Sequence, residues 1–483
     1  MKDACMKRSL PRIVIAGMRG GSGKTTLSLG LIAAWRSKGL AVAPYKKGPD
    51  YIDAGWLSAA AGRLCYNLDP FMIGNEKILS SFAQHFQGAD FAVIEGNRGL
   101  YDGMDAAGTY STAELAKTLR APVVVILDCT KVTRTMGAMV LGMIKFDPKV
   151  DIKGVVLNQI AGTRHEKIVT EVIRNYCCVP VLGAIPKLRS GLSERHMGLT
   201  PFQEHPEVQK AVSNTSEIVR KYVDLEKFAE IARGAAGIAL PDFGGGDPSV
   251  AETEKPVIGI VRDSAFQFYY PENFEELERH GARLVEISAL AEKKLPEIDA
   301  LYIGGGFPET NSIPLAQNVS FRRSVKRAVE GGLPVYAECG GLMYLGKALL
   351  LAGRKYPMVG VFPITFSLEK RPQAHGYTTV RVSGTNPFYR KGTVLKGHEF
   401  HYSRVLGCGK KEGMGFSFSM KRGQGIMDKR DGVWYKNTLA TYTHLHAYGA
   451  PEWAECLVKK ARSYKRGKSN DKKRAGNKVS KGR

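Results

Sequence analysis

The feature that most constrains this chain is a glycine-rich segment near its N-terminus, Gly17-Met18-Arg19-Gly20-Gly21-Ser22-Gly23-Lys24-Thr25-Thr26, between an apolar run and a helical pattern. Glycines let successive backbone N–H groups curl around phosphate oxygens, and the N-terminus of the following helix adds partial positive charge. Lys24 can then reach the β- and γ-phosphates, and the Thr25 hydroxyl can ligate Mg²⁺. The segment predicts an ATP-binding loop at the end of a strand.

The loop departs from the strict pattern G-x-x-x-x-G-K-[ST], because Met18 stands where a glycine is required and Gly17 lies one residue early. The alternative is a glycine-rich turn that binds nothing. The order of strand, loop, Gly-Lys-Thr-Thr and helix favours phosphate binding. The residues expected to line the nucleotide are Gly20, Gly21, Gly23, Lys24, Thr25 and Thr26.

Composition sets the broad class of protein. Of 483 residues, 43% are apolar and 24% are charged, which is typical of a soluble globular chain with two or three domains. No apolar run is long enough for a transmembrane helix, and the start of the chain has no secretory-signal pattern. The eight cysteines form no C-x-x-C pair. We therefore expect a cytoplasmic protein with mostly buried thiols.

The formal net charge of +24 is partly local. Residues 459–483 contain twelve Lys or Arg, one Asp and few apolar side chains, so this basic tail is predicted to be disordered. Such a tail can hold nucleic acid loosely, but a solvated tail is the simpler interpretation. We expect small-molecule substrates, no membrane and no specific nucleic acid, with a homodimer left open.

Two regions of alternating strand-like and helix-like segments flank a Gly-rich break at 244–246. In the first region, short runs rich in Val and Ile predict buried parallel strands at 12–17, 91–95, 122–128, 153–158 and 180–185. The same alternation resumes at 256–262 and continues to 334–337. The pattern predicts two three-layer α/β domains, 1–235 and 256–458, joined by a linker at 236–255 and followed by the tail.

Two acidic segments are expected beside the phosphate loop. One is Lys46-Lys47-Gly48-Pro49-Asp50-Tyr51-Ile52-Asp53, and the other begins at Glu95, where the 91–95 strand ends. Carboxylates at the carboxyl ends of neighbouring strands suit a Mg–nucleotide site. Pro and Gly beside acids also mark plain turns, but the place of both segments in a P-loop domain favours a functional role.

Cys339 stands out among the cysteines because it follows a buried strand signal and precedes Gly340, Gly341 and a helix. This is the pattern of a nucleophile on a sharp strand-to-helix turn, where the helix N-terminus is expected to lower the thiol pKa. A Cys nucleophile needs a base, and His444 is the candidate. The backbone of 304–306, Gly-Gly-Gly after another strand, could complete an oxyanion hole.

The segment His398-Glu399-Phe400-His401-Tyr402 has two histidines at a spacing that could ligate a metal on a helix. It is not H-E-x-x-H, and its neighbours have strand character. We therefore expect a substrate-contacting or structural segment rather than a zinc site.

These segments together resemble the cobyrinic acid a,c-diamide synthase family, of the CobB/CbiA type, over about residues 10–458. The carrying segments are 17–26, 46–53, 67–70, 95–103, 111–116, 194–199, 268–273, 304–309, 337–345, 398–403 and 444–446. The resemblance implies an N-terminal dethiobiotin-synthetase-like domain that acts as an ATP-dependent amide ligase. It also implies a C-terminal class I glutamine amidotransferase domain.

The resemblance also implies the chemistry. Cys339 would attack glutamine and His444 would activate it, and the pair would be a dyad because His446 stands where class I triads usually have Glu. ATP would phosphorylate a and c acetate carboxylates of a tetrapyrrole, and the released ammonia would displace phosphate to leave an amide.

The resemblance assigns roles to residues of the N-terminal domain as well. Thr25, Asp50 and Glu95 would ligate Mg²⁺, Lys24 and Lys46 would bind phosphate, and Asn158 would contact adenine.

Some residues keep other substrates and functions open. Asn97-Arg98 and the segment 128–134 add polarity or positive charge where corrin-specific members differ, which leaves sirohydrochlorin, siroheme or nickel-sirohydrochlorin as alternatives to cobyrinic acid. A partitioning ATPase related to MinD and ParA is a more distant alternative. Those proteins carry Lys where this chain has Arg19, and they have no second domain with Cys339 and His444.

Overall fold

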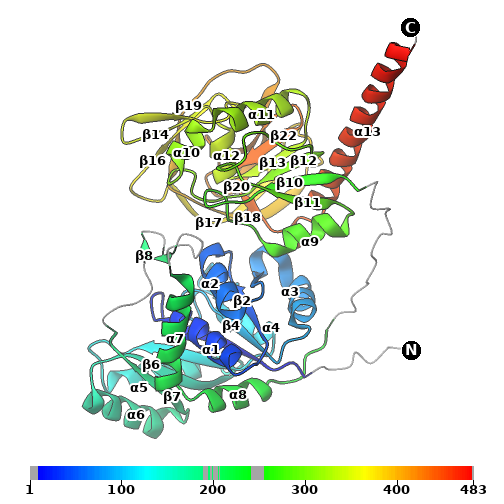
Figure 1. Ribbon diagram of the computed structural model, residues 1–483. Coiled ribbons are helices and arrows are strands. Elements are labelled where there is room, and N and C mark those ends of the chain that lie inside the picture. Colours follow the sequence, from blue (N-terminus) through cyan, green and yellow to red (C-terminus); the bar gives the residue numbers. More distant parts are fainter. Residues whose placement is uncertain are drawn as a thin grey trace, which may run out of the picture. The chain divides into compact units, whose positions relative to one another are not determined.

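The computed structural model describes residues 9–188, 194–195, 198–199, 205, 207–240 and 255–480. The chain divides into two compact units, residues 1–244 and 245–483 (Figure 1). Most of the predicted linker, residues 241–254, lies outside the described residues. Among the helices of the described ranges, none combines the length and apolar character that a membrane span requires.

The first unit is built on a seven-stranded sheet in the order β3-β2-β4-β1-β5-β6-β7, and every neighbouring pair is parallel. The strands are β1 (Arg12–Gly17), β2 (Val42–Lys47), β3 (Tyr66–Leu68), β4 (Phe91–Glu95), β5 (Val123–Asp128), β6 (Ile152–Ile160) and β7 (Val181–Pro186). The central strands are almost wholly buried, as their Val- and Ile-rich runs predict. All five strands predicted for this region are present, with ends displaced by no more than two residues.

Helices cover both faces of this sheet. They are α1 (Lys24–Ser37), α2 (Tyr51–Ala61), α3 (Pro70–Phe86), α4 (Thr112–Thr118), α5 (Thr135–Phe146), α6 (Thr163–Cys177), α7 (Val208–Tyr222) and α8 (Leu225–Arg233), with a two-stranded ribbon of β8 (Glu194–Arg195) and β9 (Gly198–Leu199). Ile13 and Ile15 of β1 share one core with α1, α2, α7 and α8. On the other face, Phe82 of α3 packs on Tyr45 of β2. The result is the predicted three-layer arrangement.

The second unit holds a ten-stranded mixed sheet in the order β11-β10-β12-β13-β22-β21-β20-β17-β18-β23. The strands from β11 to β22 in that order are parallel, and the rest pair antiparallel. Their bounds are β10 (Val257–Val261), β11 (Arg283–Ile287), β12 (Ala300–Ile303), β13 (Val335–Glu338), β17 (Ala374–Val382), β18 (Val394–His401), β20 (Met414–Arg422), β21 (Arg430–Tyr435), β22 (Thr438–Thr441) and β23 (His444–Leu445).

Successive side chains of a strand point to opposite faces of the sheet, and this unit has a hydrophobic core on each face. Val335 and Ala337 of β13 enter a core with α11 and α12, whereas Tyr336 enters a core with α9 and α13. The helices are α9 (Pro271–Arg279), α10 (Ser312–Gln317), α11 (Val319–Glu330), α12 (Gly340–Leu345), the 3₁₀ turn η3 (Ala447–Gly449) and α13 (Glu452–Ser480). This unit is therefore also three-layered.

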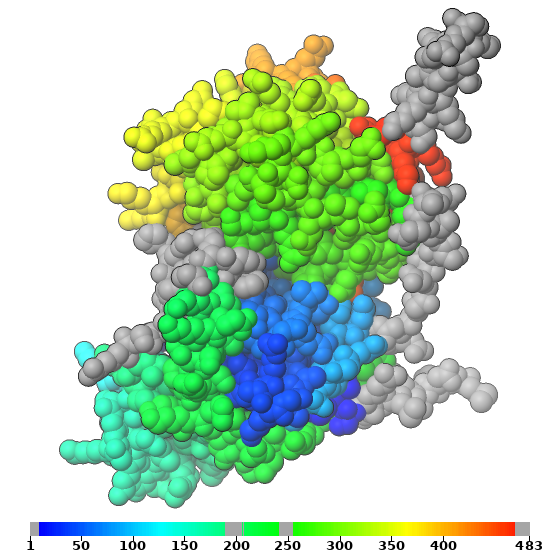
Figure 2. All heavy atoms as spheres, in the orientation of Figure 1, coloured from blue at the N-terminus to red at the C-terminus, as the bar shows by residue number. Residues whose placement is uncertain are grey.

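A second, four-stranded sheet, β15-β14-β16-β19, belongs to the same unit. It comprises β14 (Ala348–Leu351), β15 (Arg354–Pro357), β16 (Ile364–Leu368) and β19 (Ser403–Cys408). By residue number, β14, β15 and β16 fall in the yellow part of the surface of this unit in the space-filling view, and β19 falls in the orange part (Figure 2).

The C-terminal tail differs from expectation. α13 runs from Glu452 to Ser480, so the prediction that the chain is disordered from Lys459 onward is wrong. The apolar spacing that begins at Trp453 continues through Leu457 to the fully buried Ala461, which carries the helix into the basic segment. Lys and Arg are also good helix formers.

Basic side chains of α13 contribute contacts as well as charge. Arg462 donates to the carbonyl of His280 at 2.7 Å, Lys465 to that of Lys255 at 2.7 Å and Lys468 to that of Ile298 at 2.6 Å. These bonds fasten the first turns of the basic segment to the second unit.

We predict that truncation after Val458 lowers the unfolding temperature by about 4–8 °C, because it removes Ala461 and these three hydrogen bonds, together worth about 2 kcal/mol. Truncation after Lys468 is the matched control and should change the unfolding temperature by less than about 2 °C. Differential scanning calorimetry compares the two. Equal stability of both truncated chains would contradict the packing of α13 described above.

Candidate active site

The phosphate loop joins β1 to α1, and its glycines adopt the backbone that the fold needs. Gly21 and Gly23 have φ of 74° and 101°, in the left-handed region. A Cβ on Gly23 would lie 2.4 Å from Nδ2 of Asn158, which donates to the carbonyl of Ser22 at 2.9 Å. Asn158, at the carboxyl end of β6, therefore braces the loop directly.

Lys24 points back across this loop. Its Nζ donates to the backbone carbonyls of Arg19 at 3.2 Å and Arg98 at 2.7 Å, and the side chain is 8% exposed. Burial, reinforced by the charge of Lys46, lowers the pKa of Lys24 to about 8. Carbonyl oxygens are weak partners for an ammonium, so this group is placed to exchange them for phosphate oxygens.

A buried cluster of charges lies beside the loop. The pairing of β2 with β4 sets Lys46 opposite Glu95, and Lys46 Nζ lies 2.9 Å from Glu95 Oε1 and 2.9 Å from Asp53 Oδ2. The Thr25 hydroxyl donates to the same Glu95 oxygen at 2.8 Å. Burial by itself lowers the pKa of Lys46, but attraction to Asp53 and Glu95 outweighs burial and raises that pKa.

Asp50 and Asp53, the two acids of the 46–53 segment, make different contacts. Asp50 is the N-cap of α2, where Oδ1 accepts from the backbone N–H of Ile52 and of Asp53 at 2.9 and 3.0 Å. Burial, together with repulsion from Asp53, raises the pKa of Asp50 to about 7. Asp53, which sequence reasoning left out of the predicted metal ligands, is the acid that reaches Lys46. Its signal in the sequence is its place in the first turn of α2, three residues after the cap.

The residues present fit a divalent cation. Glu95 Oε2 is buried and accepts no hydrogen bond, and two further hard oxygen donors belong to the same cluster, the Thr25 hydroxyl on Glu95 Oε1 and the Asp53 carboxylate on Lys46. Among the described residues, no group of three or more His, Cys, Asp or Glu side chains is already arranged around a metal position. Lys46 therefore supplies the positive charge that the carboxylates need in this structure.

The second unit presents the predicted cysteine turn. Cys339 lies between β13 and α12 with φ of 46° and ψ of −97°, and its N–H donates to the carbonyl of Thr441 at 2.8 Å. A Cβ on Gly340 would lie 3.0 Å from the amide nitrogen of Gly306, and one on Gly341 would lie 2.5 Å from the carbonyl oxygen of Ile303. Only glycines fit this close approach of the turn to the loop that follows β12.

The electrostatics of Cys339 differ from expectation. Burial, followed by the charges of Glu309 and Glu338, raises the pKa of the thiol. The expected lowering of this pKa is not seen, since α12 is only six residues long and desolvation outweighs its polarity. A buried neutral thiol depends on a base to become a nucleophile.

His444 lies at the start of β23, which pairs with β18 and sets His444 opposite His398. The two rings stack at 4.8 Å. A Cβ on Gly305 would lie 2.5 Å from Cε1 and 3.4 Å from Nε2 of His444, so this edge of the imidazole faces the glycine loop beside the cysteine turn. On the other edge, Nδ1 lies 3.3 Å from Oε2 of Glu338.

Asp431 accepts hydrogen bonds from the turn at residues 441–443 that precedes His444. This buried carboxylate accepts from the hydroxyl of Thr441 at 2.7 Å, from that of Thr443 at 3.0 Å and from the amide of Tyr442 at 3.0 Å. The turn before His444 is therefore fixed from inside the unit, a role that no local sequence pattern indicated.

His398 and His401 lie in β18, in keeping with the strand character of their neighbours. His401 stacks on Tyr442 at 3.7 Å, and its Nδ1 lies 2.8 Å from the carbonyl of Ser403. Burial, followed by the charge of His444, lowers the pKa of His398, so this ring is neutral. Within the described part of the chain these histidines belong to no metal cluster.

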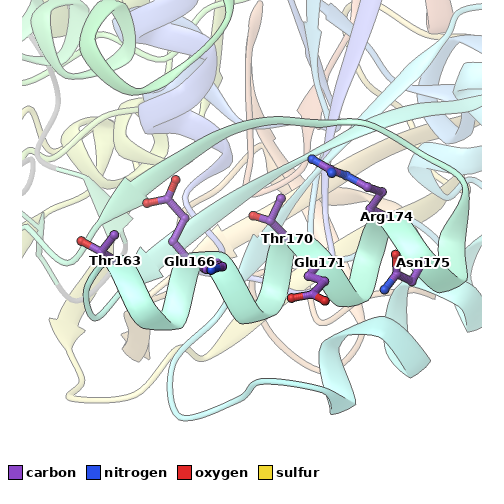
Figure 3. Close-up of a pocket in the computed structure, with 7 residues that line it drawn as sticks. Thr163, Glu166, Thr170, Glu171, Arg174 and Asn175 are labelled. Atoms are coloured by element: carbon purple, nitrogen blue, oxygen red, sulfur yellow. The ribbon is translucent and has the colours of Figure 1, made fainter.

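One surface hollow of the first unit involves none of the site residues described above. It follows α6 and is lined by Thr163, Glu166, Lys167, Thr170, Glu171, Arg174 and Asn175, six of which are labelled in Figure 3. All come from one helix and carry charges of both signs, and none is a predicted site residue.

Comparison with known proteins assigns each unit to a domain family. Residues 13–197 match the CobQ/CobB/MinD/ParA nucleotide binding domain, and residues 257–451 match the CobB/CobQ-like glutamine amidotransferase domain. The fold and these matches define a nucleotide-binding, glutamine-dependent ligase with one domain for each task.

Curated relatives match nearly the whole chain. The cobyrinate a,c-diamide synthase of Magnetococcus marinus is 42% identical over 94% of this chain and 98% of its own length. Those of Archaeoglobus fulgidus and Caldanaerobacter subterraneus subsp. tengcongensis are 41% and 38% identical over 94% of this chain and 98% and 99% of theirs. The chain belongs to the cobyrinate a,c-diamide synthase family, as the resemblance predicted, and the predicted fold class is confirmed.

The charge cluster gives a direct test of its geometry. We predict that Lys46→Met lowers the free energy of unfolding by about 3 kcal/mol without divalent cations, because Glu95 and Asp53 lose their buried counter-charge. Millimolar Mg²⁺ should recover most of that loss, as a cation in the same place restores neutrality. Urea unfolding with and without Mg²⁺ measures both effects.

Lys38→Met is the matched control, since Lys38 pairs with Glu226 on the surface at 2.8 Å. Its effect should stay below about 0.5 kcal/mol with or without Mg²⁺. If Mg²⁺ stabilised Lys46→Met no more than it stabilises the unaltered chain, the cluster would not be a cation site.

Proposed function

We propose that this enzyme converts the a and c acetate carboxylates of cobyrinic acid into amides, using ATP and glutamine. The observation that carries the proposal is the pairing of two complementary sites in one chain, a phosphate loop with buried carboxylates and a cysteine turn with an imidazole. The names of the relatives, which match along their full lengths, supply the substrate.

The first site would activate the acid. A carboxylate is a poor acylating agent, so the γ-phosphoryl group of ATP is transferred to it, giving an acyl phosphate and ADP. The backbone amides of Gly20, Gly21 and Gly23, with Lys24 and Thr26, would hold the phosphates, and Asn158, which donates to the carbonyl of Ser22, would contact adenine. The remaining predicted loop residue, Thr25, would ligate Mg²⁺.

A magnesium ion would be held by Thr25, Glu95 and a carboxylate of the 50–53 segment, where the resemblance implies Asp50 and the structure places Asp53 in contact with Lys46. Bound there, Mg²⁺ neutralises charge on the β- and γ-phosphates. Lys46, which contacts Glu95 and Asp53 in this structure, would bind the transferred phosphoryl group.

The second site would supply nitrogen. His444 takes the thiol proton as the Cys339 sulfur attacks the carboxamide carbon of glutamine, and gives that proton to the departing ammonia. Water then hydrolyses the γ-glutamyl thioester to glutamate and restores the thiol. Ammonia attacks the acyl phosphate, forming the C–N bond and releasing phosphate. Free ammonia at neutral pH is mostly ammonium, so generating it within the same chain is an advantage.

We predict that Cys339→Ser abolishes amidation with glutamine and retains amidation with ammonium salts, because it removes the nucleophile and leaves the ATP site intact. Each amidation replaces OH by NH₂ and lowers the product mass by about one unit, which mass spectrometry follows. Lys24→Met is the companion variant and should lose amidation with either nitrogen source. Retained glutamine use by Cys339→Ser would remove the cysteine from the chemistry.

The substrate is tested by offering cobyrinic acid, sirohydrochlorin and siroheme separately, with ATP, Mg²⁺ and glutamine. We expect a mass decrease of about two units with cobyrinic acid and none with the other two. A shift only with sirohydrochlorin or siroheme would move the substrate and direct attention to Asn97 and Arg98. ATP hydrolysis that ignores glutamine and yields no amide would favour a partitioning-type ATPase.

A further inference from the structure

The residue two positions after His444 is already engaged elsewhere. His446 Nε2 lies 3.4 Å from Glu272 Oε1, and its Nδ1 accepts from the amide of Tyr448 at 3.2 Å as the cap of η3. Its ring therefore belongs to a separate buried pair with Glu272. His446 does not substitute for the glutamate that orients the base in most class I amidotransferases.

A different carboxylate contacts His444. Glu338, the last residue of β13, lies immediately before Cys339, and its Oε2 is 3.3 Å from Nδ1 of His444. Glu338 is 1% exposed and His444 is 2% exposed. The two side chains thus meet in a dry environment, where a charge-assisted hydrogen bond has its largest effect.

The carboxylate of Glu338 is itself firmly held. Its Oε1 accepts from the hydroxyl of Tyr336 at 3.1 Å and from the backbone amide of Leu445 at 3.1 Å, and the Tyr302 hydroxyl lies 3.5 Å from Oε2. Every one of these neighbours is a donor. Since Leu445 follows His444 directly, the Glu338 carboxylate contacts both the His444 ring and the backbone of the next residue.

The backbone of Cys339 explains how neighbouring residues can serve one imidazole. In an extended strand Glu338 and Cys339 would point to opposite faces. The left-handed φ of 46° at Cys339 turns the chain sharply, so that Gly340 packs against the glycine loop that faces the Nε2 edge of His444, whereas Glu338 approaches Nδ1. The turn at Cys339 and the carboxylate that contacts His444 therefore belong to the same two-residue segment, Glu338-Cys339.

We propose that Glu338 is the positioning residue for His444 and that the glutaminase site is a Cys339–His444–Glu338 triad rather than a dyad. The proposal rests on the assignment of Cys339 and His444 under the proposed function. A carboxylate only accepts, so Nδ1 of His444 carries the proton and Nε2 is the unprotonated nitrogen that takes the thiol proton. Glu338 also stabilises the imidazolium that this transfer produces.

The test is Glu338→Gln, which keeps the size of the side chain. The fixed donor at Leu445 holds the amide oxygen, so the amide NH₂ faces Nδ1 of His444 and moves the ring proton to Nε2. We expect the kcat of glutamine hydrolysis to fall on the order of 10³-fold with the KM for glutamine changed by less than about threefold. Amidation driven by ammonium salts should stay within about twofold.

The position of the proton on the His444 ring is measured alongside the kinetics. The ¹⁵N chemical shifts of the His444 imidazole, assigned by comparison with His444→Gln, should report the Nδ1–H tautomer in the unaltered chain and the Nε2–H tautomer in Glu338→Gln. Glu338→Asp, which keeps the charge but shortens the reach, should recover at least tenfold of the lost kcat. A residue needed only for folding would produce neither the tautomer change nor this rescue.

Glu272→Gln is the matched control, because Glu272 is an equally buried carboxylate that lies 3.4 Å from a different histidine, His446. Its glutaminase kcat should stay within about threefold of the unaltered chain. Equal losses in Glu272→Gln and Glu338→Gln, or loss of ammonium-driven amidation in Glu338→Gln, would overturn the positioning role.

Cys339→Ser separates the two levels of the account. If Cys339→Ser lacks glutaminase activity while Glu338→Gln retains it within threefold, the triad is overturned and the proposed function stands. If Cys339→Ser still hydrolyses glutamine, the proposed function itself fails.

Discussion

Both candidate sites depend on one constraint, the alignment of strand ends in a parallel sheet. Parallel pairing places the carboxyl ends of neighbouring strands at the same edge, so whatever follows each strand is gathered there. In the first unit this brings together the phosphate loop after β1, Lys46 in β2 and Glu95 in β4. In the second unit it gathers the glycine loop after β12, Cys339 after β13 and the turn after β22.

Burial then determines what those groups do. Lys46, Glu95 and Glu338 are almost fully removed from water, where an isolated charge is costly and a paired one is strongly held. Lys46 is balanced by two acids, and Glu338 is surrounded by donors. The first arrangement is one that a metal ion and phosphates can enter by displacing the ammonium. The second fixes the orientation of an imidazole, which is a positioning role.

The sequence was most informative where elements are long, apolar and parallel. The strands around β1, β4 and β5 were predicted closely because burial on both faces leaves nearly continuous Val and Ile. Among the strands from β14 to β21, the sequence indicated strand character only on either side of the segment 398–402, where β18 and β19 lie. Strands such as β15, which is mostly exposed, show no clean alternation and were not predicted. α13 was missed beyond Lys459 because composition outweighed the apolar spacing that reaches Ala461.

The candidate site residues also divide into those that the sequence predicted and those that it did not. Cys339 and His444 were predicted from the turn motif and the order of segments, and the contacts between Glu95, Thr25 and Lys46 join the segments expected to lie together. Asp53 and Glu338 were missed because their roles depend on side-chain direction. A residue next to a nucleophile normally points away from it, and only the left-handed backbone at Cys339 reverses that expectation.

The most direct test of the account is the fate of carboxylate oxygen during amidation. Cobyrinic acid labelled with ¹⁸O in its carboxylates should yield inorganic phosphate carrying one ¹⁸O atom for each amide formed with glutamine, because the account routes each carboxylate through an acyl phosphate. Phosphate free of ¹⁸O, with amide still produced, would contradict the coupling of the two sites through an activated acid.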